Sequence, residues 1–161
     1  MERLERLRRR VDRILLEQDD NELRHDGYAH LYGVSVTASL LAARRGLAQE
    51  LCAAGGMLHD LYTYETGEER DHARHGAEIA ACMLRAIEGF TDEEIDTVVT
   101  SIRRHSDKGE VDGPYDECLK DADVLQHWLY EPGKKFNRDK ARRLRATMAE
   151  LGLAGAVREE E

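Results

Sequence analysis

The chain has 161 residues, of which 41% are hydrophobic and 35% are charged, and its formal net charge at pH 7 is −9. This length predicts one globular domain with its own core, and the composition excludes a disordered chain. The acidic balance argues against binding of a nucleic-acid polymer. No apolar run approaches the roughly 20 residues that span a bilayer, so no membrane partner is expected.

The cysteines and the N-terminus predict a cytoplasmic location. Cys52, Cys82 and Cys118 are far apart in the sequence and form neither a disulfide framework nor a thiolate zinc motif. The charged residues 1–6 also lack the apolar region of a signal peptide. A reducing compartment is therefore expected.

Apolar residues recur every three or four positions through most of the chain, and proline is rare. This pattern predicts an all-α, compact single-domain bundle of about six to seven helices over the whole chain. Residues 61–70 and 106–115 lack the period and are expected to be loops. The expected helices cover residues 2–18, 26–45, 47–61, 71–87, 91–105, 115–130 and 137–151.

Local signals refine several of these helices. Thr91 and Glu94 have the spacing of a capping box at a helix start. Gly55 and Gly56 interrupt the most apolar helix, which predicts close approach of a neighbouring helix there. Asp121 and the basic residues of segment 138–145 are expected to point outward from their amphipathic helices.

His59 and Asp60 stand side by side at the end of that apolar helix. Burying either side chain without a partner costs several kcal/mol, and a metal ion would satisfy both. Other candidates lie on core-facing stripes or in the terminal turns of other helices. A lone histidine in such a place is more commonly an ordinary core residue, so the hypothesis rests on the combination. The candidate ligands are His30, His59, Asp60, His72, His105 and Asp123.

Imidazole and carboxylate groups without thiolate are typical ligands of Fe²⁺, Mn²⁺, Co²⁺, Ni²⁺ or Zn²⁺. The predicted cofactor is therefore one or two divalent transition-metal ions. A first ion is expected to be held by His30, His59, Asp60 and Asp123. Four protein ligands would leave positions open for water and substrate, which is typical of a catalytic site. His72 and His105 would bind a second ion, with Asp60 able to bridge the two.

At these residues the chain resembles the HD-domain metal-dependent phosphohydrolases, whose pattern is H…HD…D. The matching residues are His30, the run Leu58-His59-Asp60 and the run Ala122-Asp123-Val124-Leu125. His72 and His105 resemble the extra histidines of members with two metals. The resemblance covers residues 25–131, and the amphipathic end helices, 1–19 and 137–152, lie outside it. It implies a compact all-helical fold and hydrolysis of a phosphomonoester or phosphoanhydride, often of a nucleotide.

The expected reaction is hydrolysis of a nucleotide or another small phosphate compound by a metal-activated water. His59 and Asp60 are the expected catalytic residues, because they hold the metal and Asp60 could also orient the water. Cationic and aromatic side chains near the site are expected to contact the substrate. These are Arg74, Arg104, Lys108, Tyr62 and Tyr64.

Other functions stay open at this point. Some relatives with the same six-ligand pattern resemble di-iron oxygenases, and a non-catalytic regulatory module that binds a nucleotide or a metal would carry the same residues. A (p)ppGpp hydrolase is less expected, because the longer segment with a Glu-Asp pair that marks those relatives is not found. The amphipathic end helices leave a homodimer open.

Overall fold

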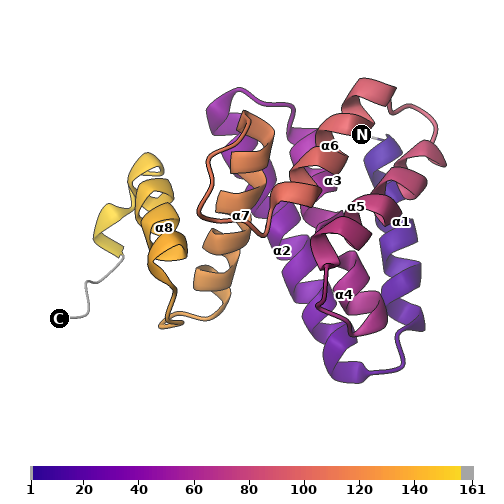
Figure 1. Ribbon diagram of the computed structural model, residues 1–161, viewed down its shortest axis with the longest axis horizontal. Helices are drawn as coiled ribbons and strands as arrows, with labels where there is room; N and C mark the ends of the chain where they lie inside the picture. Colours follow the sequence, from indigo (N-terminus) through magenta and orange to yellow (C-terminus); the bar gives the residue numbers. More distant parts are fainter. Residues whose placement is uncertain (1, 157–161) are drawn as a thin grey trace.

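The computed structural model describes residues 2–156 and is all-helical over that range (Figure 1). Its elements are α1 (Glu2–Glu17), α2 (Asn21–Arg45), α3 (Gln49–Leu58), α4 (Leu61–Thr66), α5 (His72–Arg85), α6 (Asp92–Arg104), α7 (Pro114–Tyr130), α8 (Arg138–Glu150) and the 3-10 helix η1 (Ala154–Ala156). The predicted all-α class is confirmed. No helix among the described residues is long and apolar enough to cross a membrane.

α2 and α3 form the centre of the bundle. α2 runs through the middle of the molecule, with α1 on one side and α7 on the other (Figure 1). A Cβ atom on Gly56 of α3 would lie 2.6 Å from the Cα and N atoms of Ser35 on α2. The expected close packing is therefore confirmed at Gly56. Gly55 has ordinary room, because a Cβ there would meet its nearest neighbour, the Ser101 hydroxyl, at 3.6 Å.

α2 begins at Asn21, five residues before the predicted start. The Asp20 carboxylate accepts hydrogen bonds from the backbone N–H groups of Glu22 and Leu23, so it caps the N-terminus of this helix. The cap thus allows the helix to include residues 21–25, in which apolar residues do not recur at helical spacing. The predicted capping box of α6 is confirmed, since Thr91 and Glu94 make both of its hydrogen bonds.

The expected loop at residues 61–70 is wrong in its first half, where α4 forms a short additional helix. Leu61 is fully buried, Tyr64 packs against the core, and the helix ends at Gly67 in the left-handed conformation. A helix of six residues presents too few apolar positions for its period to be visible in the sequence. This helix keeps residues 61–66 beside the turn that carries His59 and Asp60.

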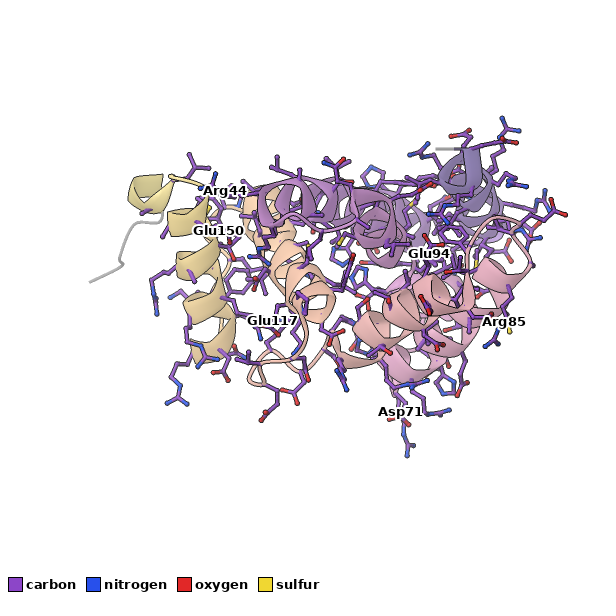
Figure 2. The ribbon with its side chains drawn as sticks, turned by 90° about the horizontal axis from the view of Figure 1, so that it is seen from above. Arg44, Asp71, Arg85, Glu94, Glu117 and Glu150 are labelled. Atoms are coloured by element: carbon purple, nitrogen blue, oxygen red, sulfur yellow. The ribbon has the colours of Figure 1, made fainter. Side chains whose placement is uncertain are left out.

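α8 packs against α7 at the edge of the molecule, over a small apolar cluster separate from the main core. Charged side chains also meet at this contact, and Figure 2 shows Glu117 and Glu150 on the side where α7 and α8 face each other. Arg143 of α8 is buried and pairs with Glu117 at 2.7 Å and with Asp121 at 3.1 Å. Asp121 also pairs with Arg45 of α2 at 2.8 Å. The outward orientation expected for Asp121 and Arg143 is therefore wrong, because each neutralises the other's charge between the helices.

Candidate metal centre

The six candidate ligands lie together where the ends of several helices meet beside α2 and α7. His59 and Asp60 form the two-residue turn between α3 and α4. His72 is the first residue of α5, and His105 follows the last residue of α6. His30 and Asp123 face this turn from within α2 and α7. A turn at a helix end leaves side chains free to converge from several directions, which explains why the ligands gather here.

The first cluster consists of His30, His59, Asp60 and Asp123. The Nε2 atoms of His30 and His59 are 3.1 Å apart. Asp60 Oδ2 lies 3.5 Å from His30 Nε2 and 3.3 Å from His59 Nε2. Asp123 Oδ1 lies 3.5 Å and 3.9 Å from the same two nitrogens. Donor atoms bound to one ion at about 2.0–2.2 Å lie at separations of this order, so the cluster fits a metal ion.

The second cluster consists of His72, His105 and Asp60. The two Nε2 atoms are 3.3 Å apart. Asp60 Oδ1 lies 3.5 Å from His72 Nε2 and 3.1 Å from His105 Nε2. The two oxygens of Asp60 therefore face different histidine pairs, Oδ2 toward the first cluster and Oδ1 toward the second. This is the arrangement of a carboxylate that bridges two ions.

Hydrogen bonds determine which nitrogen of each histidine is free. In all four, Nδ1 lies within 2.9 Å of a carbonyl oxygen. A carbonyl oxygen only accepts, so Nδ1 carries the proton and Nε2 keeps its lone pair, which is the tautomer that binds metals. The contacts run from His30 to the Gln126 side chain, from His59 to Gly56, from His72 to Glu69 and from His105 to Ile102.

This arrangement leaves electron-rich atoms facing one another inside the protein. The lone pairs of His30 and His59 point together, as do those of His72 and His105. Asp60 Oδ1 and Asp123 Oδ1 are buried and receive no hydrogen bond within residues 2–156. Such groups are costly to bury without a partner. A cation in each cluster would satisfy all of them, so the donor set fits one or two divalent metals.

The pKa shifts point the same way. Burial opposes ionisation of Asp60, yet His59, His105 and His30 hold its pKa well below the ordinary value. Burial alone would lower the pKa of His59, but Asp60 and Asp123 raise it overall. The pKa of His105 is lowered by burial, against the effect of Asp60. The surroundings of Asp60 thus favour its anionic form, which is the form that binds a cation.

Lys108 lies in the site, but its ammonium group is engaged with the protein. It is 5% exposed, and its Nζ donates to Asp123 Oδ2 at 2.6 Å and to the His105 carbonyl at 2.5 Å. Burial would raise the pKa of Asp123, but Lys108 is the main cause that holds it well below its ordinary value. Lys108 therefore orients Asp123 so that Oδ1 faces the histidines.

The two predicted arginine contacts lie on the surface and pair with acids. Arg74 donates to Glu78 at 3.0 Å, and Arg104 donates to Asp116 at 3.0 Å. About half of each arginine side chain is exposed, 54% and 50% respectively. Each arginine is paired with an acid that is not a candidate ligand, so it would have to leave that acid to reach a substrate in the site.

The two predicted tyrosines differ in their environment. Tyr62 stacks on His75, which is not a candidate ligand, with ring centroids 4.7 Å apart. Tyr64 lies beside His30, with ring centroids 5.9 Å apart. Tyr64 is thus the one of the pair that faces the first cluster.

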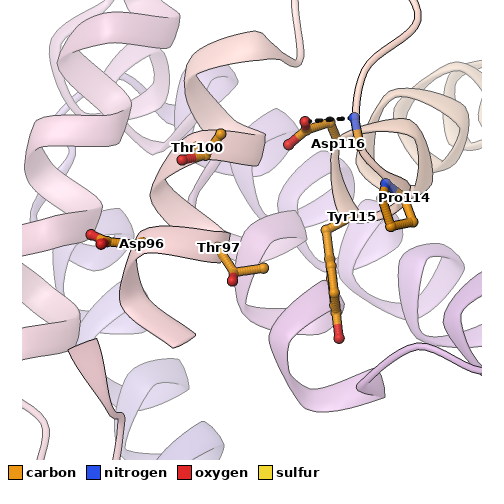
Figure 3. A pocket seen from close by; sticks show the side chains of 7 residues that line it. Asp96, Thr97, Thr100, Pro114, Tyr115 and Asp116 are labelled. Carbon is orange, nitrogen blue, oxygen red and sulfur yellow. Dashed lines mark hydrogen bonds between the residues drawn. The ribbon is translucent and has the colours of Figure 1, made fainter. Parts of the chain in front are cut away.

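A cavity of about 240 Å³ opens onto the first cluster at His30. Its lining residues are Asp26, Ala29, His30, Tyr64, Gln126, His127, Tyr130, Glu131 and Lys134. A larger pocket of about 310 Å³ lies between α6 and the start of α7, lined by Thr97, Thr100 and Tyr115 among others (Figure 3). That pocket contains none of the candidate ligands, whereas the cavity at His30 opens onto the first cluster.

Two residues of this cavity were not singled out from the sequence. Gln126 orients His30, as described above, and His127 Nε2 lies 3.3 Å from Asp123 Oδ1. The signal for His127 is its position four residues after Asp123, which places both side chains on one face of a helix. Five of the seven histidines in the chain thus belong to the metal-competent groups.

Comparison with known proteins shows the family to which the chain belongs. The HD domain family model matches residues 27–128, which include all six candidate ligands. The chain therefore belongs to the HD domain family, and the resemblance inferred from its motifs is confirmed. Among solved structures it is similar to a predicted HD superfamily hydrolase from an uncultured Thermotogales bacterium. The two share 23% sequence identity over 92% of this chain and 91% of that one, with a TM-score of 0.58. No curated protein matches the chain.

Proposed function

We propose that this protein is a two-metal phosphohydrolase that cleaves a phosphomonoester or a phosphoanhydride of a small molecule, with nucleotides as the first substrates to test. The observation that carries the proposal is the division of Asp60, whose two oxygens each face a separate histidine pair. Two ions joined by one carboxylate are suited to hold a phosphoryl group and an attacking water together.

When bound, the ions supply Lewis-acid chemistry, since they lower the pKa of a water molecule and polarise a phosphoryl oxygen. His30, His59 and Asp123 would hold the first ion, and His72 and His105 would hold the second. Asp60 would contribute one carboxylate oxygen to each. Each histidine is oriented by the carbonyl oxygen at its Nδ1, so the site is formed before substrate binds.

The cavity beside His30 is the proposed place for the organic part of the substrate. Tyr64 and Tyr130 offer aromatic surface to a base or another ring. Lys134 pairs with Glu131 at 2.8 Å and would have to leave that acid to bind a phosphate. Asp26 and Glu131 give the same cavity acidic groups, which can accept hydrogen bonds from sugar hydroxyls or base amino groups.

The proposal is tested by phosphate release from a panel of nucleotides, phosphomonoesters and phosphoanhydrides, with Fe²⁺, Mn²⁺, Co²⁺, Ni²⁺ and Zn²⁺ supplied in turn. Asp60→Asn should lower turnover at least about a hundredfold, since even the loss of an outer partner of a ligand costs 10- to 100-fold. His25→Gln, on an exposed histidine outside both clusters, should have no effect. Full turnover by Asp60→Asn would remove the bridging role.

The same two clusters also fit a di-iron oxygenase, because both reactions need two adjacent ions. Protein purified anaerobically and loaded with iron distinguishes the two. Oxygen consumption on a polyol or phosphonate, with no phosphate released from the phosphomonoesters and phosphoanhydrides, would select the oxygenase. Tight nucleotide binding with neither reaction would select a regulatory module.

A further inference from the structure

His127 lies where a fifth ligand of the first ion would come from. It is on α7, one turn after Asp123, and its side chain is 31% exposed in the cavity described above. Its ring lies 4.6 Å from that of His30, measured between centroids. Donor atoms of His30, Asp123 and His127 all lie within 4.8 Å of one another, as do those of His30, His59 and Asp60.

His30 belongs to both of these groups, and this decides how many ions they describe. Its Nδ1–H group donates a hydrogen bond to the side-chain oxygen of Gln126, so only Nε2 has a lone pair that can bind a metal. A single imidazole lone pair binds one ion. His30 therefore cannot bind one ion in each group at the same time. We take the two groups to surround a single ion.

The neighbouring carboxylate supports the same conclusion. Asp123 Oδ2 is occupied by Lys108, and Oδ1 is directed at both His30 and His127, at 3.5 and 3.3 Å. Asp123 Oδ1 is buried and receives no hydrogen bond of good geometry among residues 2–156, from either His127 or His30. The two imidazoles and this oxygen therefore converge at separations that a shared cation would satisfy.

We propose that His127 is a fifth protein ligand of the first-cluster ion and reaches it from the cavity side. This inference rests on the metal centre of the proposed function and adds to it. The ion would then have three imidazoles and two carboxylates, which leaves one octahedral position for water or substrate. A set this rich in nitrogen favours Fe²⁺, Co²⁺, Ni²⁺ or Zn²⁺ over Mg²⁺ and Mn²⁺.

Metal affinity tests the proposal without any substrate. Metal-free full-length protein is titrated with Co²⁺, and binding is followed by calorimetry and by the visible absorption of the bound ion. His127→Gln should weaken one binding event by on the order of tenfold or more and change its spectrum, whereas His25→Gln should match the wild type. Unaltered affinity and spectrum in His127→Gln would overturn the proposal while leaving the metal centre intact. A wild type that binds no Co²⁺ would overturn both.

A second measurement needs no variant and so does not depend on folding of the mutant. Diethyl pyrocarbonate acylates accessible imidazole nitrogens, and peptide mass spectrometry locates the products. His127 should react in metal-free protein and be protected once Co²⁺ is bound. His25, which is 79% exposed, should react in both states. Equal modification of His127 with and without Co²⁺ would contradict ligation.

Discussion

Asp60 owes its role to its place between two elements rather than to its chemistry alone. It caps neither neighbouring helix with its side chain, so both carboxylate oxygens remain free for other partners. One oxygen faces His30 and His59, and the other faces His72 and His105. A carboxylate one residue earlier or later would point elsewhere, since successive residues in a turn differ in direction. The adjacency of His59 and Asp60 is thus a geometric requirement of the site.

Lys108 compensates the negative charge of Asp123 when no metal is bound, and replacing it tests whether Asp123 faces the ion. Lys108→Met removes the cation that holds Asp123 and leaves a buried carboxylate unpaired, which costs about 3–5 kcal/mol. Urea unfolding of metal-free protein should show this loss. Saturating divalent metal should reduce it, because the ion compensates the same carboxylate. Arg103→Met, on an exposed residue of α6, is the matched control. Equal losses with and without metal would show that Asp123 does not face the ion.

At the scale of elements, the separation of α2 and α3 controls the first cluster, because His30 and His59 come from these two helices. Gly56 sets that separation, and its carbonyl oxygen also accepts the Nδ1 proton of His59. Any side chain at this position would push the helices apart and turn the His59 ring. We therefore expect the glycine to matter for metal binding as well as for packing.

Gly56→Ala should lower the free energy of unfolding by about 1–3 kcal/mol, the usual cost of overpacking, and should also weaken metal binding. Gly55→Ala is the matched control in the same helix, since a Cβ there meets only ordinary contacts. It should leave metal affinity unchanged and alter stability by no more than about 1 kcal/mol in the favourable direction. Denaturant unfolding and metal titration of both variants check this. Identical behaviour of the two would refute the proposed link.

At the scale of the whole molecule, α8 lies outside the family match, yet it supports the site through a loop. Arg143 donates to the Lys108 carbonyl at 2.8 Å and to the Glu110 carbonyl at 2.7 Å. It thereby anchors residues 106–113, the loop that carries Lys108 to Asp123. The helix contributes no candidate ligand, so its effect on the metal centre is indirect.

Arg143→Met should lower the free energy of unfolding by about 1–3 kcal/mol, because it leaves the Lys108 and Glu110 carbonyls without their donor and removes one partner of the half-buried acids Glu117 and Asp121. Lys120 and Arg45 still pair with these acids, which limits the loss. Hydrogen exchange should accelerate in residues 106–113 and not in α1, which lies on the far side of the bundle. Arg145→Met, on an exposed arginine of the same helix, should change neither quantity. Uniform acceleration across the chain would argue against local anchoring.

The sequence predicted the helical class and singled out six side chains that the structure brings together, since each combines a metal-competent group with a buried helix face or end. It could not show how the oxygens of Asp60 are divided, because that depends on the packing of α4 and α5 around one turn. The burial of Arg143 could not be predicted for a similar reason. Amphipathic spacing predicts that a basic residue of α8 is exposed, and Arg143 is buried only because acids of α7 pair with it in the folded molecule.

The central claim is that Asp60 joins two metal ions, and anomalous diffraction tests it most directly. Crystals of protein purified without a nickel column and soaked in Co²⁺ or Zn²⁺ are measured at the absorption edge of that metal. The account predicts two peaks on either side of Asp60, one among His30, His59 and Asp123 and one between His72 and His105. A single peak, or peaks remote from Asp60, would contradict it.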